Sequence, residues 1–180
     1  MQTTSHKTKS ERVHITTVCG MNLLRLKSWL PDNEGGGKPV LLEQLELPSL
    51  VGATVSGILR VLCLGPGDWM VVSHDQEAAT LSQRIRPDLC QRGFILVDLS
   101  DGLAVLEVSG SAIRDVLSKG CGLDFHPRNF PAGWCARTRF AQIPLTIECL
   151  DESPRFQLYA TRSYLHYLLD WFSDASVEFE

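Results

Sequence analysis

The sequence predicts an α+β protein made of two lobes, each with the strand and helix order of a ferredoxin-like split βαβ unit. In the first half, apolar segments follow the order strand, helix, strand, strand, helix, strand. The second half shares this order coarsely, although we see no repeat at the level of residues. The composition, 44% hydrophobic and 21% charged, is that of a globular chain with a core.

The elements of the first half follow from periodicity and turn residues. Residues 13–27 are rich in apolar and β-branched residues, and we expect a strand there with a bulge at Gly20. Leucines on one side favour a short helix over 39–47, which Pro48 ends. The tight turn Gly65-Pro66-Gly67-Asp68 joins two strands. The remaining elements expected here are strands over 57–65, 68–73 and 93–99 and a helix over 73–87.

The second half starts with the clearest pattern in the chain. Residues 103–108 alternate as a strand buried mainly on one face does, and Ser109 and Ser111 offer hydroxyl caps for a helix ending at Lys119-Gly120. The loop from Cys121 to Trp134 has no period, and ordered loops of this length are usually functional or part of an interface. The elements expected after it are strands over 136–144, 146–150 and 156–159 and a closing helix over 162–175.

Length and end composition give the domain organisation. Residues 1–11 are polar, and we expect a disordered N-terminal tail there. The rest, 12–180, fits a single domain whose two lobes cover about 12–99 and 100–180.

Charge and cysteine usage exclude several classes of protein. A net charge of −4 without a dense basic patch argues against nucleic-acid binding. No apolar run approaches the ~20 residues that span a bilayer, and the polar N-terminus is not a secretory signal. We therefore expect a cytoplasmic protein whose six cysteines are reduced. Those cysteines form no close pairs with one another or with histidine, so we expect no metal site.

The residues of this chain that could be catalytic also suit ordinary structural roles. Ser100, Asp101 and His126 invite a nucleophile–base–acid interpretation, but their spacing matches no known signature, and Asp98, Ser100 and Asp101 are good turn residues. Cys121 follows a helix C-terminus, where the dipole disfavours a thiolate. The Gly65–Asp68 turn lacks the spacing of a phosphate loop. The sequence thus predicts no catalytic and no cofactor-binding residue.

A partner interface is the better-supported kind of site. His126 and Arg128 flank a proline in the 121–134 loop and have the chemistry to engage an anion or a partner carboxylate. Trp134 closes the same loop and is a candidate exposed anchor. Tyr167 and Trp171 exceed what one apolar face of the closing helix needs, so one of them is expected to face a neighbouring chain.

Several separated motifs, in the right order, resemble one known family. SDGLAVLEVSG at residues 100–110, RDVLSKGC and the following HPRNFPAG, LGPGDWMVVS at residues 64–73 and RSYLHYLLDWFSDA at residues 162–175 are similar to the gamma subunit of heterotetrameric sarcosine oxidase. The resemblance covers the chain after about residue 50 and, more weakly, the strand near 13–26. It implies two interlocked lobes like those of the glycine-cleavage T-protein, or folate-binding, fold.

The resemblance also implies a function. Members of that family belong to complexes that oxidatively demethylate sarcosine to glycine, with hydrogen peroxide and either formaldehyde or methylene-tetrahydrofolate as products. It places FAD, FMN, NAD, tetrahydrofolate and zinc in the partner subunits and none in this chain. Its partners would be the alpha, beta and delta subunits, alpha most directly, and the chain would be a non-catalytic scaffold.

Three alternatives stay open at the level of sequence. One is a stand-alone folate or one-carbon-binding protein on the same lobes, in which Asp98 or Asp101 would hold the pterin. Another is a subunit of a complex that demethylates a related N-methyl amine. The third is an interaction protein whose ancestral complex has been lost.

Overall fold

The chain builds two units, and one of them is interrupted by the other. The structure is a computed structural model that describes residues 12–28, 41–42, 45–56, 59–74, 80, 82–83, 86 and 93–179. Unit 1 contains the chain up to Cys19 and again from Gly102, whereas unit 2 runs from Gly20 to Asp101. The predicted N-terminal tail, 1–11, lies outside the described residues, and so does most of the predicted helix over 73–87.

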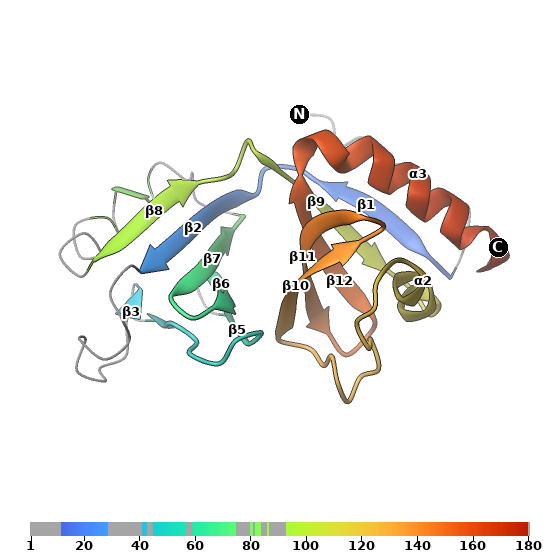
Figure 1. Cartoon of the computed structure of the whole chain (residues 1–180), viewed down its shortest axis with the longest axis horizontal. Coiled ribbons are helices and arrows are strands. Elements are labelled where there is room, and N and C mark those ends of the chain that lie inside the picture. The colour runs from blue at the N-terminus through green and yellow to red at the C-terminus, as the bar shows by residue number, and fades with distance from the viewer. Residues whose placement is uncertain are drawn as a thin grey trace. The chain divides into compact units, whose positions relative to one another are not determined.

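Unit 1 is a five-stranded antiparallel sheet with helices on one face (Figure 1). Its strands, in spatial order, are β1 (His14–Val18), β9 (Leu103–Ser109), β12 (Arg155–Thr161), β11 (Ile143–Asp151) and β10 (Trp134–Phe140). Its helices are α2 (Ile113–Gly120) and α3 (Leu165–Ser176), and single 3-10 turns precede and follow α3 at Arg162–Tyr164 and Val177–Phe179. This arrangement confirms the predicted α+β class.

The core of unit 1 lies between the sheet and its helices. Along β12, Phe156 and Leu158 are fully buried in this core, while Gln157 and Tyr159 alternate onto the opposite face. Phe172 of α3 belongs to the same cluster. Burying side chains of this size contributes roughly 1.5–3 kcal/mol each, so this face dominates the stability of the unit.

Unit 2 is a second five-stranded antiparallel sheet, accompanied by a small hairpin. Its core includes Trp69, whose ring lies 6.0 Å from that of Phe94 and whose indole N–H donates to the carbonyl of Pro48 at 2.8 Å. The predicted hairpin turn at Gly65–Asp68 is confirmed. Its strands, in spatial order, are β5 (Thr54–Ser56), β6 (Arg60–Gly65), β7 (Asp68–Ser73), β2 (Asn22–Ser28) and β8 (Phe94–Asp98), and the separate hairpin is β3 (Leu41–Leu42) with β4 (Leu45–Glu46).

The single strand predicted over 13–27 is in fact two strands of different sheets. β1 pairs with β9 of unit 1, and β2 pairs with β7 and β8 of unit 2. Gly20, with φ of 76°, lies in the connection between them and is no bulge. The predicted lobe over 12–99 therefore loses its first strand to the other lobe. Local composition identifies a strand but carries no information about its partner.

Two further local predictions are wrong. The segment predicted as a helix over 39–47 forms the β3–β4 hairpin, because the same leucine spacing also fits paired strands. The predicted hydroxyl caps of α2 are absent, since its N-cap residue is Ala112 and no side chain caps the helix. Backbone carbonyls take that role: Ala112 N–H donates to Arg12 O at 3.2 Å and Ile113 N–H donates to Gly110 O at 3.1 Å.

The β10–β11 hairpin turns earlier than the sequence predicts. Its turn residues are Ala141 and Gln142, with φ of 46° and 70°, and Pro144 lies inside β11 opposite Arg139. Such a pair of positive φ values suits a two-residue hairpin, although glycine and asparagine are the residues that adopt it most readily. Ala141 N–H donates to Gly120 O at 2.8 Å, and the Tyr167 hydroxyl donates to Ala141 O at 2.8 Å. The turn is thus held by both helices.

Candidate interface loop

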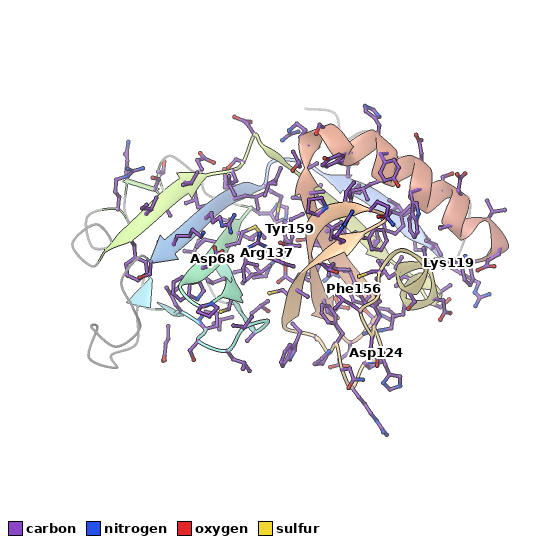
Figure 2. All side chains as sticks on the ribbon, viewed as in Figure 1. Asp68, Lys119, Asp124, Arg137, Phe156 and Tyr159 are labelled. Atoms are coloured by element: carbon purple, nitrogen blue, oxygen red, sulfur yellow. The ribbon has the colours of Figure 1, made fainter. Side chains whose placement is uncertain are left out.

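The loop that joins α2 to β10, residues 121–133, carries two of the predicted interface residues, and we call it the 121–133 loop. At its base, Gly133 N–H donates to Cys149 O at 3.0 Å. Figure 2 shows Asp124 on the part of the loop that projects away from the sheet, and Phe156 in the sheet itself.

Two phenylalanines anchor this loop to the core. Phe125 and Phe130 are 2% and 5% exposed, and their rings lie 5.7 Å apart. Both contact the ring of Phe156, at 6.0 and 6.3 Å between centroids. Aromatic pairs at this spacing contribute about 0.5–1.5 kcal/mol beyond the burial of their area, so the loop is fastened at two points.

Arg114 of α2 makes hydrogen bonds to the backbone at both of these phenylalanines. Its Nη1 donates to the carbonyl oxygens of Phe125 and of Phe130, the second at 3.3 Å. Its guanidinium carbon lies 5.0 Å from the centroid of the Phe156 ring, a cation–π distance. Nη2 also lies 3.8 Å from Cys149 Sγ, but burial outweighs this cation and raises the pKa of the Cys149 thiol. Arg114 therefore stabilises the loop and does not activate the Cys149 thiol as a nucleophile.

Asp124 organises the outer turn of the loop. One carboxylate oxygen accepts the backbone N–H of His126 at 2.9 Å, and the other accepts the side-chain amide of Asn129 at 2.6 Å. These two bonds, the first contributing most, hold the pKa of Asp124 below its usual value. The carbonyl of His126 accepts the N–H groups of both Asn129 and Phe130 at 2.9 Å, which closes a single tight turn.

The tip of this turn presents His126, Pro127 and Arg128 to solvent. The backbone N–H of Arg128 donates to Nδ1 of His126 at 3.2 Å, which assigns the proton of a neutral imidazole to Nε2. The guanidinium of Arg128 makes no hydrogen bond or ion pair with any other residue in the described part of the chain. The structure thus brings His126 and Arg128 together at one exposed point.

The other predicted interface residues lie elsewhere in unit 1. Trp134 is half-buried at the first position of β10. Tyr167 is 45% exposed, although its hydroxyl is bonded to the turn at Ala141. Trp171 packs within the chain, because its ring lies 4.7 Å from that of Phe140 and 5.2 Å from that of Phe172. A contact of these three residues with a partner stays a prediction.

The remaining candidates have structural partners. The Ser100 hydroxyl donates to Asp98 at 2.6 Å, and its oxygen accepts the N–H of Leu23 at 3.0 Å, as expected of a turn residue. Cys121 is buried with Sγ 3.1 Å from the hydroxyl oxygen of Thr138.

Within the described residues, no three histidine, cysteine or acidic side chains form a group that could hold a metal ion. None of the helices in that part of the chain is long and apolar enough to cross a membrane.

Sequence reasoning missed Arg114 and Asp124, and it also missed a polar row across the sheet of unit 1. On the face away from the helices, Tyr159 Oη lies 2.7 Å from a Glu148 oxygen and 2.9 Å from the Gln157 amide oxygen. Gln157 in turn donates to Glu107 at 3.0 Å. A cross-strand polar network of this kind fixes the register of β9, β12 and β11. The sequence does carry a signal for this row: polar residues alternate with apolar ones around Glu107 and over residues 155–160.

Comparison with known proteins first defines the class of fold. The structure matches the glycine cleavage system aminomethyltransferase T from Bartonella henselae with a TM-score of 0.57 and 14% identity, over 92% of this chain and 46% of that one. At this identity the likeness shows a shared fold and nothing more. The expected relation to the T-protein fold is thereby confirmed.

The family follows from closer matches. The family model described as sarcosine oxidase, gamma subunit family, matches residues 40–178, so the chain belongs to that family. Sarcosine oxidase subunit gamma from Corynebacterium sp. strain P-1 is 32% identical over 148 residues, which cover 80% of this chain and 71% of the relative. The subunit gamma of strain U-96 is 28% identical, covering 83% and 73%. A chain of the solved heterotetrameric sarcosine oxidase of strain U-96, in complex with pyrrole 2-carboxylate, matches with a TM-score of 0.84 and 27% identity, over 96% of this chain and 88% of that one.

Proposed function

We propose that this chain is the non-catalytic gamma subunit of a heterotetrameric sarcosine oxidase complex and that it acts as an assembly scaffold. The observation that carries the proposal is the match to a chain of a solved heterotetramer, with a TM-score of 0.84 over 96% of this chain. A likeness over almost the whole chain supports equivalence of the whole subunit, because it extends to both units and is not limited to one motif.

In this proposal the reaction belongs to the complex. Sarcosine is oxidatively demethylated to glycine with hydrogen peroxide, and its methyl carbon leaves as formaldehyde or as methylene-tetrahydrofolate. FAD, FMN, NAD, tetrahydrofolate and zinc are assigned to the alpha, beta and delta subunits. The chain described here contributes surface to those subunits, alpha most directly, in the cytoplasm. A stand-alone folate-binding role has only the shared T-protein fold behind it.

The contact surface is proposed to include His126, Arg128, Trp134, Tyr167 and Trp171. The support is strongest for His126 and Arg128, which are exposed on a loop that the core holds in place. Loops positioned by a rigid scaffold carry recognition more often than cores do. Tyr167 adds a partly exposed aromatic ring, a residue type that is enriched at interfaces.

Omission of the chain tests the scaffold role. The partner subunits are expressed together in one host, with and without this chain, and their assembly state, flavin content and sarcosine oxidation are compared. We expect the full assembly and its activity only when the chain is present. A complex of the partner subunits that forms without this chain and is as active as the full assembly would contradict the proposal.

A further inference from the structure

We propose that the tip of the 121–133 loop, residues 126–128, docks on an acidic surface of a partner subunit of the complex. There the guanidinium of Arg128 pairs with a carboxylate. This inference rests on the proposed function, since it names the chemistry of a contact within the complex. It assigns to one residue a role that the family relationship leaves undefined.

The first argument is the chemistry that the tip presents. His126 accepts a hydrogen bond at Nδ1 from Arg128 N–H, so its ring carries the proton on the other nitrogen and offers a donor. Arg128 offers the N–H groups of a planar fork that matches a carboxylate in two parallel hydrogen bonds. Both oxygens of Asp124, the acid of this turn, are engaged within the loop. Within the described residues, the Arg128 guanidinium is the charged group of this tip that makes no internal hydrogen bond or ion pair.

The second argument is that the loop is ordered before any partner arrives. Phe125 and Phe130 are buried, Arg114 binds both of their carbonyls, and Asp124 closes the turn between them. A surface ordered in advance loses less conformational entropy on binding, which leaves more of the interaction energy as affinity. The Arg128 side chain takes no part in this internal bonding within the described residues. The backbone of Arg128 is therefore held in place by the turn, while its guanidinium is available to a partner.

The third argument concerns which anion fits. Phosphate and carboxylate both match a guanidinium, but a nucleic acid is bound by several cations that neutralise a run of phosphates, and the 121–133 loop carries one arginine and no lysine. A single cation at the tip of an acidic chain suits a local cluster of carboxylates on another protein. Charge complementarity of this kind accelerates association and fixes the orientation of the complex.

A competition experiment within the assembled complex tests the inference. The partner subunits are expressed together with two differently tagged copies of this chain, one wild type and one variant, and the ratio of tags in the purified complex is compared with the ratio in the soluble extract. The variants are Arg128→Ala and Arg128→Glu. The matched control is Lys27→Glu, which reverses an exposed cation on β2 of unit 2.

We expect Arg128→Ala to be incorporated about tenfold less than wild type, the ratio that about 1.4 kcal/mol of lost binding energy produces. Arg128→Glu is expected to fall further, because it places two like charges together. Lys27→Glu should be incorporated as wild type is. Incorporation of Arg128→Glu at parity would overturn the inference and leave the proposed function intact, and an equal fall for Lys27→Glu would overturn it as well. Absence of even the wild-type chain from the complex would instead refute the proposed function.

Discussion

Arg114, a half-buried residue near the start of α2, holds the 121–133 loop in place. Its guanidinium donates hydrogen bonds to the carbonyl oxygens of Phe125 and Phe130 and lies over the ring of Phe156. A buried carbonyl without a donor is costly, so Arg114 stabilises the ordered loop in addition to the two buried phenylalanines.

Replacing Arg114 with methionine should therefore destabilise unit 1. Hydrogen bonds from a charged group contribute about 1.5–3 kcal/mol, and we expect Arg114→Met to lower the free energy of unfolding by about 2 kcal/mol. Urea unfolding followed by tryptophan fluorescence measures this change. The control is Arg128→Met, which removes the same charge from the loop tip and should leave the unfolding midpoint unchanged. Equal midpoints for both variants would contradict the role given to Arg114.

Asp124 gives the loop a dependence on pH whose direction is fixed. Hydrogen bonds from His126 N–H and Asn129 lower its pKa in the folded chain, so the carboxylate form is favoured by folding. Its stabilising contribution is complete above the ordinary aspartate pKa of about 3.9 and is lost as the pH falls through the lower folded value. Asp124→Asn lacks this titration. We expect the stability of the wild type, measured relative to Asp124→Asn, to be constant from pH 7 to about pH 5 and to fall below about pH 4. Parallel curves through pH 3 would contradict this.

At the scale of elements, the meeting of α2, α3 and the β10–β11 hairpin depends on a glycine. A Cβ at Gly120 would lie 2.7 Å from Cζ of Phe140 and 2.8 Å from Cη2 of Trp171. Both rings are already packed against each other at 4.7 Å, so neither has room to move away. The glycine thus allows the close approach of helix and hairpin that also holds the turn at Ala141.

Gly120→Ala should consequently cost about 1–3 kcal/mol, the usual penalty for overpacking a core. Gly122→Ala, two residues later, is the matched control, because nothing lies within 4 Å of its Cβ position. Thermal unfolding of the two variants gives the comparison. A Tm for Gly120→Ala equal to that of Gly122→Ala would show that the close packing described here is wrong.

Which elements could be predicted depended on how local their determinants are. β7, β9, α2 and α3 were predicted because alternation, helical spacing and turn residues all lie within the segment itself. The β3–β4 hairpin was missed because its leucines satisfy a helical and a paired-strand pattern equally, and tertiary pairing decides between them. His126 and Arg128 were identified from loop composition, whereas Arg114 was missed because its contacts are with residues 11 and 16 positions away.

At the scale of the whole molecule, the first strand is separated in sequence from the unit it completes. β1 pairs along its whole length with β9, and Ile15 and Val13 lie in the core of unit 1. The entire chain from Gly20 to Asp101 intervenes. A contiguous C-terminal half of the chain therefore lacks one edge strand and part of its core.

This arrangement predicts the behaviour of fragments. Residues 102–180 alone should not fold cooperatively, because β9 becomes an unpaired edge and the sites of Val13 and Ile15 are left empty. Joining residues 12–19 to residue 102 by a short Gly/Ser linker should restore folding, since the register places Val18 beside Val105. Circular dichroism melts of the two fragments decide the point. A cooperative melt of 102–180 with the same Tm as the linked fragment would contradict the assignment of β1.

The central claim, that this chain is a subunit of a sarcosine oxidase complex, is tested most directly by isolating the tagged chain from its native host. The eluate is analysed for co-purifying subunits, for absorbance at flavin wavelengths and for oxidation of sarcosine. We predict a yellow complex that oxidises sarcosine and contains this chain. A colourless chain recovered without partners would contradict the claim.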